Sequence, residues 1–351
     1  MGKRDRRYIA ELNEGEKFYG FYLVVEKVLK YAKNDNPYLD ILLQDRTGRI
    51  AAKLWEKAQE MDAEFDVGDI VGVAGAVEKF RDSIQIKIEK IRRIDEEKRI
   101  EENLTDSEFI VTTPKNIDEM WSEIWEIIKN IKNPYLSKLL SRIYRKYEKQ
   151  LKSLPGSMRL HHAYQGGLLE HIFNTVKIAK SICKVYDEID EELFIAGVLA
   201  HDIGKIRELS GKYVFDYTDE GNFIGHVVLG RDMLIEEAKE IEGFPELLRL
   251  KLEHIILSHH GKYEWQSPKE PAFPEAQLVY QIDEIDTRLY QMKNSIESDV
   301  SEGKWTSKSN YFKRVLYKGE NPEKPLDNED NETRGKEGKE TKTDDKQTSL
   351  F

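Results

Sequence analysis

The strongest constraint on the fold is a change in hydrophobic periodicity near residue 117. Residues 15 to about 95 have strand-like patterns; from Ile84 to Ile88, for example, isoleucine occupies every second position. That period is typical of strands with one buried face. From Ile117 onward the apolar residues recur at helical spacing instead. A chain of 351 residues has room for two domains, so we predict a β domain followed by an all-helical (all-α) domain.

The N-terminal part predicts five strands, with a short helix after the third. Gly72 and Gly75 within the fourth strand predict a bend or bulge, because glycine weakens a regular strand. This element order is that of an OB-fold barrel, whose open face commonly binds oligonucleotides. We therefore expect a five-stranded OB-fold over residues 1–95. Its expected elements are the strands Phe18–Tyr31, Tyr38–Leu43, Arg49–Trp55, Ile70–Val77 and Ser83–Ile91 and the helix Lys57–Phe65.

The rest of the chain divides by composition into three parts. The stretch from Asp95 to Thr105 is charged and has little apolar content, so we expect a linker over residues 96–116, which could be helical. Residues 117–318 show no strand-like alternation and predict an all-helical domain. Residues 319–351 cannot bury enough apolar surface to offset the entropy of ordering, so we expect a disordered charged tail. The expected helices include 167–187, 190–208, 226–242, 245–260 and 274–298.

Charge and cysteine content exclude several classes of protein. The net charge is −11; the tail holds ten acids and six bases, a net of −4, which leaves −7 for the rest. A nucleic-acid-binding role therefore requires a local basic groove rather than a basic protein. The single cysteine, Cys183, excludes a disulfide framework and zinc sites built from several thiolates. With no signal-peptide pattern and no membrane-spanning apolar run, we expect a cytoplasmic protein that uses no membrane; the oligomeric state stays open.

All eight histidines lie between positions 161 and 260. A lone histidine on an apolar helix face is usually structural, but an ordered set on successive helices predicts a metal site. Imidazole and carboxylate together suit Mn²⁺, Fe²⁺, Co²⁺, Ni²⁺ or Zn²⁺. An Asp directly after a His can bridge two ions, and two ions can clamp both reacting oxygens of a phosphoryl displacement. The candidate ligands are His171, His201, Asp202, His226, His259, His260 and Asp283.

This ordered set resembles the two-metal form of the HD phosphohydrolase superfamily. The string from Leu160 to His171, together with an N-terminal OB-fold, narrows the likeness to the YhaM-type 3′-to-5′ exoribonucleases. The resemblance covers residues 15 to about 300. It implies two divalent metal ions, with Mn²⁺ favoured, and a metal-activated hydroxide that hydrolyses phosphodiester bonds. It also implies that single-stranded RNA, and single-stranded DNA as a further substrate, is shortened from the 3′ end to nucleoside 5′-monophosphates.

Several residues beside the ligands are candidates for catalysis. Asp202 is expected to act in catalysis as well as to bind metal. Lys205 follows His201 by four residues on one face of an expected continuous helix, where its cation would hold a phosphate oxygen. A solvated lysine is the alternative. His161 or His162 could contact the scissile phosphate or protonate the leaving group; a structural role at the helix entry is the alternative for both.

Three ligand questions stay open in the sequence. Neighbours on a helix point about 100° apart, so one of His259 and His260 is expected to ligate more easily than both. We favour His259 for the metal and His260 for the substrate or for contact with a ligand. Glu170 and Asp286 could orient ligating imidazoles, with solvated carboxylates as the alternative.

The predicted barrel carries candidate nucleic-acid contacts on and near its central hairpin and its last turn. Aromatic rings with nearby cations are how OB-folds hold single strands. The alternative is that these rings fill the barrel core or stabilise the hairpin. The candidates are Lys53, Trp55, Phe80, Arg81 and Lys87.

Two other function classes remain compatible with the sequence. One is an HD-type nucleotide phosphohydrolase or signalling phosphodiesterase with a regulatory OB-fold, which would act on free nucleotides without length dependence on RNA. The other is a non-catalytic single-strand-binding module with a structural metal, which would bind RNA and release no mononucleotide.

Overall fold

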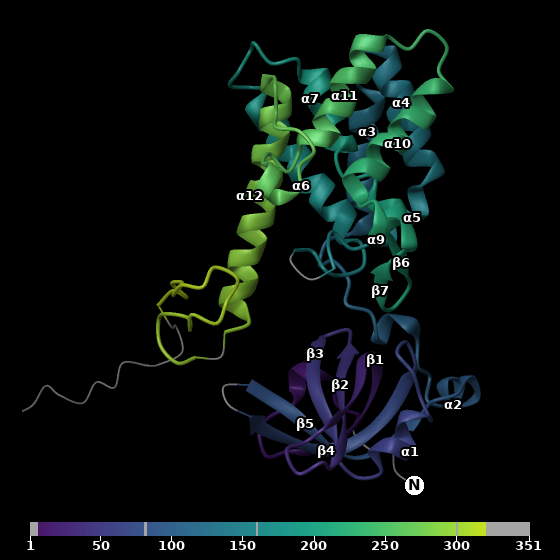
Figure 1. Ribbon diagram of the computed structural model, residues 1–351, viewed down its shortest axis with the longest axis vertical. Coiled ribbons are helices and arrows are strands. Elements are labelled where there is room, and N and C mark those ends of the chain that lie inside the picture. The colour runs from purple at the N-terminus through teal and green to yellow at the C-terminus, as the bar shows by residue number, and fades with distance from the viewer. Residues whose placement is uncertain (1–5, 81–82, 159–160, 300, 321–351) are drawn as a thin grey trace, which may run out of the picture.

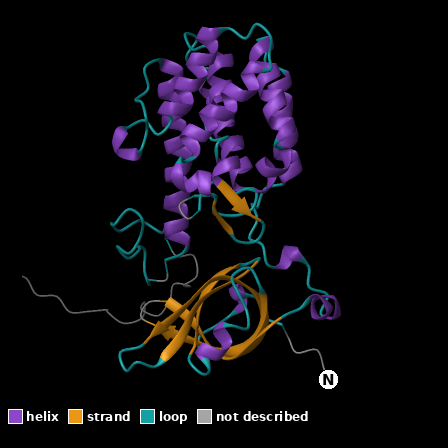
Figure 2. Ribbon diagram, turned by 45° about the vertical axis from the view of Figure 1, so that its right-hand side comes forward, coloured by secondary structure: helices purple, strands orange, loops and turns teal. Residues whose placement is uncertain are grey.

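The structure, a computed structural model, describes residues 6–80, 83–158, 161–299 and 301–320. Within them, the N-terminal strands close into a barrel of order β1-β2-β3-β5-β4, and α1 follows the third strand (Figures 1 and 2). The predicted OB-fold is confirmed. Its elements are β1 (Lys17–Tyr31), β2 (Pro37–Asp45), β3 (Gly48–Leu54), α1 (Ala58–Asp62), β4 (Ile70–Phe80) and β5 (Ser83–Arg93).

Alternating apolar side chains and one glycine shape the barrel. Leu39, Ile41 and Leu43 of β2 point inward and are at most 2% exposed, as the period of two requires. The register of β4 on β5 shifts between Ala74 and Gly75. A Cβ at Gly75 would lie 2.3 Å from the Lys87 carbonyl oxygen, so the backbones can meet there only because position 75 lacks a side chain. The predicted bulge in the fourth strand is therefore present at Gly75.

The segment between the domains is ordered and packs on the barrel. It contains α2 (Glu96–Glu101) and a 3₁₀ turn, η2 (Asp106–Glu108). Leu104 and Phe109 are buried in one apolar cluster with barrel residues of β1 and β4, and the Gln44 side chain donates a hydrogen bond to the Phe109 carbonyl at 2.8 Å. The helix that the sequence allowed in this linker is α2. The few apolar residues of the segment anchor it to the barrel, which its charged composition did not indicate.

The C-terminal domain is a bundle of helices above the barrel (Figure 1). Its centre is α7, whose residues Leu193–Ala200 are all buried, as their nearly continuous apolar sequence requires. Among the described residues, no helix combines the length and apolar composition needed to cross a bilayer. The helices are α3 (Ile117–Lys129), α4 (Pro134–Lys146), α5 (Glu148–Ser153), α6 (Gly167–Ile182), α7 (Glu191–Ala200), α8 (Lys205–Glu208), α9 (Asp219–Phe223), α10 (His226–Lys239), α11 (Glu246–Ser258) and α12 (Pro274–Glu297).

The predicted helical domain is confirmed, with two local departures from the sequence prediction. The expected helix 190–208 is interrupted by a turn between α7 and α8, where a Cβ on Gly204 would lie 1.8 Å from the His226 carbonyl oxygen. The close approach of α10 fixes a glycine at this turn. The domain is also not purely helical, because β6 (Leu209–Gly211) pairs with β7 (Phe215–Tyr217). Strands of three residues are too short for alternation to reveal them.

The turn between β6 and β7 packs against the barrel and the segment that follows it. Tyr213 and Val214 pack against the apolar cluster that contains Leu104 and Phe109. The Lys212 ammonium donates to the Asp106 carboxylate of η2 at 2.7 Å. The hairpin therefore joins the helical domain to the barrel. The predicted disordered tail lies, apart from Gly319 and Glu320, outside the described residues.

Candidate metal centre and nucleic-acid surface

Five helical elements deliver the predicted ligands to one buried place. His171 comes from the first turns of α6, the His201-Asp202 pair from the turn after α7, and Asp283 from the middle of α12. His226 begins α10, and His259-His260 follows α11. The side chains of His171, His201, Asp202 and His259 are all 3% exposed or less. Polar groups at such depth need partners, so their convergence requires a chemical reason.

The first cluster, the His171 group, consists of His171, His201 and Asp283. His171 Nε2 lies 3.1 Å from His201 Nε2 and 3.3 Å from Asp283 Oδ1. Ligand atoms about 2 Å from one ion lie about 3 Å from each other. The separations within this group therefore suit a single divalent ion.

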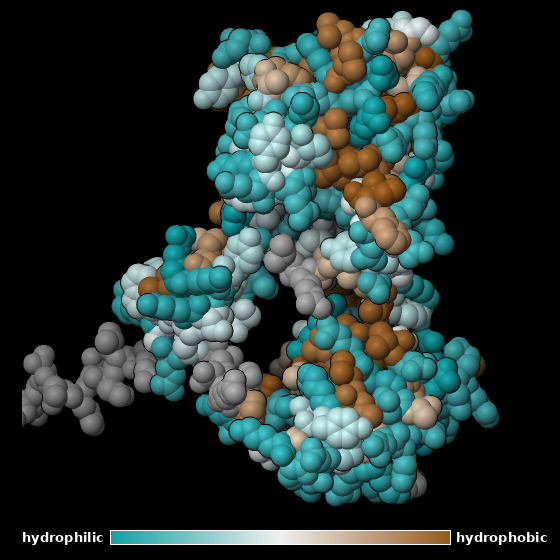
Figure 3. All heavy atoms as spheres, viewed as in Figure 1, coloured by the Kyte–Doolittle hydropathy of each residue, from teal (hydrophilic) through white to brown (hydrophobic). Residues whose placement is uncertain are grey.

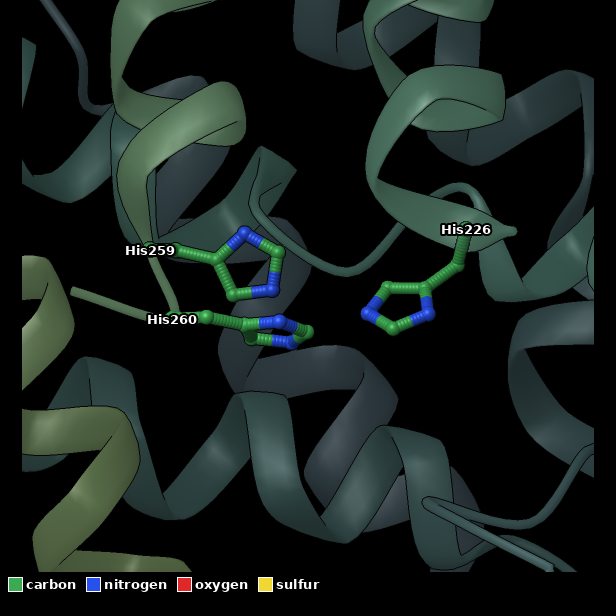
Figure 4. Close-up of side chains that lie close together, drawn as sticks. All are labelled: His226, His259 and His260. Carbon is green, nitrogen blue, oxygen red and sulfur yellow. The ribbon is translucent and has the colours of Figure 1, made fainter. Parts of the chain in front are cut away.

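The second cluster, the His226 group, consists of His226, His259 and His260, whose rings point toward one another (Figure 4). One nitrogen from each lies within 4.8 Å of the others. The Nε2 atoms of His226 and His259 are buried without a hydrogen-bond partner among the described residues. Such orphaned nitrogens each destabilise a fold by about 1–3 kcal/mol, and a metal ion is a partner that satisfies both.

Asp202 lies between the two groups and presents one carboxylate oxygen to each. Oδ2 is 3.6 Å from His171 Nε2 and 3.5 Å from His201 Nε2. Oδ1 is 3.6 Å from His226 Nε2 and 3.7 Å from His259 Nε2. This is the placement of a carboxylate that bridges two ions.

The imidazoles are fixed in orientation through their other nitrogen. In each case Nδ1 is held by an oxygen, so that Nε2 faces the centre, as is usual for ligating histidines. The bonds are His171 to Asp286 (2.8 Å), His201 to the Val198 carbonyl (2.7 Å), His226 to Glu208 (2.9 Å), His259 to the Ile256 carbonyl (2.7 Å) and His260 to the Trp265 carbonyl (3.0 Å).

The expectation that His259 and His260 diverge fails because α11 ends at Ser258. The pair lies in a turn, so the 100° separation of helical neighbours does not apply. The two ring centroids are 4.3 Å apart, and both rings face His226 (Figure 4). The geometry therefore presents both residues as ligand candidates.

Burial and neighbouring charges set the protonation of the centre. Burial disfavours the imidazolium form and lowers the pKa of His259 well below its usual value, and it also lowers that of His201. For Asp202, burial acts in the raising direction, but Lys205 and the surrounding imidazoles outweigh it and hold the pKa well below its usual range. Neutral imidazoles, as His201 and His259 present, are the forms that bind divalent metals. At His171 burial again acts in the lowering direction, but hydrogen bonds and charges of Asp283 and Asp286 outweigh it and raise the pKa to about 10, so an ion bound there would displace the proton of this ring.

Lys205 is buried and bonded to the bridging carboxylate. Its Nζ donates to Asp202 Oδ2 at 2.5 Å. The predicted helical relation to His201 is wrong, because residues 201–204 form a turn rather than part of a continuous helix. The solvated alternative is also wrong, since the side chain is only 8% exposed. Lys205 also lines the cavity beside the centre.

The two histidines before α6 have different surroundings. His162 has a left-handed backbone, with φ of 46°, and lies between the Tyr164 hydroxyl at 2.8 Å and Asp286 Oδ2 at 2.9 Å. Both ring nitrogens of His161 are buried without a partner in the described part of the chain. His161 also lines the cavity that holds Asp202, whereas His162 belongs to the network behind His171.

A cavity of about 550 Å³ opens onto both groups. Its floor includes His161, Asp202, Lys205, His226 and Asp283, and aromatic and basic residues stand farther out, among them Trp265, Arg288 and Tyr311. A space of this size admits a nucleotide unit. The polar floor and aromatic wall suit a phosphate with a base attached.

Comparisons with known proteins agree with this geometry. An HD domain model matches residues 168–288, and a model for an OB-fold nucleic acid binding domain matches residues 23–94. Over 294 residues the chain is 35% identical to the 3′-5′ exoribonuclease YhaM of Bacillus subtilis (strain 168), covering 84% of this chain and 92% of that protein.

Two further relatives have the same name. The protein of Bacillus licheniformis is 33% identical over 314 residues, 88% of this chain and 98% of its own length. That of Listeria innocua is 37% identical over 286 residues, 81% of this chain and 89% of its own length. The chain belongs to the YhaM family of 3′-5′ exoribonucleases. The predicted resemblance is confirmed, and the HD domain of this YhaM-family chain is a divalent-metal-binding domain.

The barrel of this YhaM-family chain carries an exposed aromatic cluster. The rings of Tyr38 and Trp55 stack with centroids 4.5 Å apart. Lys53 Nζ lies 5.3 Å from the Tyr38 ring and 5.1 Å from the Phe80 ring. Trp55 is 42% exposed and Phe80 48%, so neither fills the core. We call Tyr38, Lys53, Trp55 and Phe80 the barrel platform.

The remaining barrel candidates lie beside the platform or outside the described residues. Lys87 borders a surface hollow together with Trp55. Arg81 lies outside the described residues. Stacked rings and a cation over them are the arrangement with which OB-folds hold unpaired bases.

Three residues of the centre were not predicted or were left undecided. Glu208 holds His226 in place, but the turn and hairpin between them hide this contact in the sequence. Asp286 joins both His162 and His171, whereas the sequence left it equally open as a solvated carboxylate. Glu170 instead accepts hydrogen bonds from Thr113 and Tyr164 and does not touch a ligating ring.

Proposed function

We propose that this chain is a divalent-metal-dependent exonuclease that shortens single-stranded RNA from its 3′ end and releases nucleoside 5′-monophosphates. The single observation that carries the proposal is Asp202, which presents one oxygen to each of two histidine groups at the floor of a cavity. The names of the relatives and the nucleic-acid-binding barrel support RNA as the substrate. Single-stranded DNA offers the same phosphodiester and bases, and is a second substrate.

The residues fit two ions of the same class. The His171 group with Asp202 Oδ2, and the His226 group with Asp202 Oδ1, would each hold one ion. When bound, two divalent ions supply Lewis acidity that activates water and stabilises the charge of the reacting phosphate. We favour Mn²⁺ because the resemblance to the YhaM-type exoribonucleases implies it; the mixed imidazole and carboxylate donors suit Mn²⁺ and equally Fe²⁺, Co²⁺, Ni²⁺ or Zn²⁺.

The side chains around the centre have distinct roles in this proposal. Lys205 keeps Asp202 ionised and places a fixed positive charge beside the reacting phosphate, where developing negative charge is stabilised. His161 faces the cavity with both nitrogens available to contact a phosphate oxygen or the leaving group. His162 acts indirectly, because it holds Asp286, which in turn orients His171.

The barrel platform would hold the strand upstream of the reacting end. Stacking of a base on Trp55 or Phe80 does not depend on base identity, because every base has a π face. The platform can therefore hold a strand whose sequence changes as it is shortened. A binding site distant from the reaction also explains why activity should increase with strand length.

The test uses 3′- and 5′-labelled 20-nucleotide RNAs with Mn²⁺. Wild-type protein should convert the 5′-labelled RNA to a descending ladder and release the 3′ label as a mononucleotide. Asp202→Asn should abolish both, whereas Asp187→Asn, a matched change of an exposed carboxylate, should leave them unchanged.

Other outcomes separate the remaining functions. Hydrolysis of free nucleotides with no increase on longer RNA would support the nucleotide phosphohydrolase. RNA binding without release of any mononucleotide, with every divalent metal tried, would refute the exonuclease and support the binding module.

A further inference from the structure

The C-terminal part of the described chain differs in composition from everything before it. It lies outside both matched family models, which end at residues 94 and 288. Between Gly303 and Lys318 there are five bases and no acid in a chain with a net charge of −11. Four aromatic residues are interleaved with these cations. The residues are Lys304, Trp305, Lys308, Tyr311, Phe312, Lys313, Arg314, Tyr317 and Lys318.

This segment, residues 301–320, has a built structure although it contains no helix. The Thr306 amide donates to the Leu316 carbonyl at 2.9 Å, and Trp305 forms a β-bridge with Tyr317. Lys318 Nζ lies 3.0 Å from Asp299 Oδ1 at the end of α12, which closes the loop at its base. Lys304 Nζ likewise lies 3.1 Å from Glu320 Oε1. The fold of the segment therefore uses Lys304 and Lys318 and leaves Lys308, Lys313 and Arg314 outside these ion pairs.

The remaining cations and most of the rings face solvent. Trp305, Tyr311 and Tyr317 are between 46% and 55% exposed. Lys308, Lys313 and Arg314 are exposed, and none forms an ion pair with a carboxylate in the described part of the chain. Exposed cations without acidic partners, next to exposed rings, form a surface complementary to phosphates and bases.

The segment also reaches the catalytic cavity. Tyr311 lines the cavity, and the Arg288 guanidinium carbon lies 5.6 Å from the Tyr311 ring centroid and 5.7 Å from that of Trp265. Figure 1 shows the segment at the free end of α12, at the level of the barrel. Figure 3 shows open space between it and the barrel, below the helical domain. A strand can therefore pass from the segment into the cavity.

We propose that residues 301–320 form a second surface for single-stranded nucleic acid, beside the mouth of the catalytic cavity. Lys308, Lys313 and Arg314 contact phosphates, and Tyr311 stacks with a base near the reacting end. The nature of the strand rests on the proposed function. The interleaving of rings with cations favours nucleic acid over an acidic protein, which would need the cations alone.

The first measurement is binding of a fluorescein-labelled 20-nucleotide RNA by anisotropy, in EDTA to prevent cleavage. The variant K308E/K313E/R314E should bind about tenfold more weakly. Three lost phosphate contacts should reduce the slope of log K against log salt by about 2, because each contributes about 0.7 for single strands. The control K180E/K184E/K239E makes the same charge change on exposed residues of α6, α10 and the loop after α6, and should bind within twofold of wild type.

The second measurement compares substrates of different length. Hydrolysis of a dinucleotide needs only the cavity, so kcat/KM should stay within twofold of wild type in K308E/K313E/R314E. With the 20-nucleotide RNA, kcat/KM should decrease about tenfold through KM.

Equal affinities of the two triple variants for the 20-nucleotide RNA would overturn the proposal. If wild type hydrolyses neither substrate, the proposed exonuclease fails, while the anisotropy comparison still decides the binding surface. If circular dichroism shows that the charge-reversal variant is unfolded, the milder K308Q/K313Q replaces it, with an expected loss of affinity of about threefold and with equal affinity again overturning the proposal.

Discussion

The metal centre and the barrel platform, to which the proposed function assigns one substrate, have opposite designs. In the centre, His171, His201 and Asp202 are at most 3% exposed, and every imidazole of the His171 and His226 groups is fixed through Nδ1. In the platform, Trp55 and Phe80 are nearly half exposed. Catalysis requires donors held in fixed geometry, whereas sequence-tolerant binding requires only accessible rings. Substitutions in the centre should therefore abolish turnover, and substitutions in the platform should weaken binding in proportion.

The largest expected effect is loss of one ligand from the centre. His226→Ala should reduce the number of bound Mn²⁺ ions from two to one and lower kcat by at least about 10³, because a two-ion clamp does not work with one ion. Metal content by mass spectrometry and kcat on labelled RNA measure both. His254→Ala is the control, since His254 lies outside both groups and its ring accepts a hydrogen bond from the Ala272 amide rather than facing the centre. If His226→Ala still binds two Mn²⁺ ions, the His226 group is not one of the two metal sites.

The residues of this centre were predicted because their identity and order appear in the sequence, but several of their relations do not. Separating His161 from His162 depends on a left-handed φ at residue 162, which no periodicity reveals. The convergence of His259 with His260 depends on the end of α11 at Ser258. The first feature lies in the loop between α5 and α6 and the second at a helix end, and sequence patterns are weakest in such places.

In the barrel, too, some features could be predicted from the sequence and others could not. The strand order followed from alternation, and it is confirmed. Whether Trp55 points into the barrel or to solvent could not be predicted. The strand β3 ends at Leu54, and the alternation of inward and outward side chains ends with it. The packing of Phe109 on the barrel depends on tertiary contacts across the chain. Elements with long regular patterns were therefore predictable, and the contacts made after those patterns end were not.

A smaller effect is expected when an outer partner of the centre is changed. Asp286 Oδ2 lies 2.8 Å from His171 Nδ1 and 2.9 Å from His162 Nε2, and Oδ1 accepts from Asn174 at 2.9 Å. Asp286→Asn should weaken Mn²⁺ binding by about 10- to 100-fold, the usual effect of losing such a partner. Glu284→Gln makes the same change two residues earlier on α12, at a carboxylate paired with Arg288, and should leave metal affinity unchanged in a calorimetric titration. Unchanged affinity in Asp286→Asn would mean that the rings are held without this carboxylate.

A substitution in the barrel platform should have a smaller effect, and it should change RNA affinity rather than turnover. Trp55→Ala removes one stacking ring, worth about 1–3 kcal/mol per base, and should weaken binding of a 20-nucleotide RNA by about 5- to 100-fold. Hydrolysis of a dinucleotide should be unaffected. Tyr31→Ala, at an exposed tyrosine elsewhere on the barrel, should bind as wild type does. Loss of dinucleotide turnover in Trp55→Ala would end the separation between platform and centre.

The smallest effect is expected at the junction between the two regions. Hydrogen bonds from Lys212 and Tyr213, with a further one from Arg99, lower the pKa of Asp106 well below its usual value despite some burial. A carboxyl group whose pKa is lower in the folded than in the unfolded protein stabilises the fold at pH values above its unfolded pKa of about 4. This contribution is lost as the pH falls through the folded pKa. Because the carboxylate is 39% exposed, solvent screening keeps its contribution within about 1 kcal/mol.

Asp106→Asn should therefore lower the free energy of unfolding in urea slightly at pH 7, and the difference from wild type should shrink as pH falls below 4. Asp187→Asn, at an exposed carboxylate, supplies the control. If the junction also holds the barrel at a fixed distance from the cavity, Asp106→Asn should change the activity on 20-nucleotide RNA more than on a dinucleotide. An equal change on both substrates would show that the junction contributes stability alone, and that platform and centre do not depend on a fixed spacing.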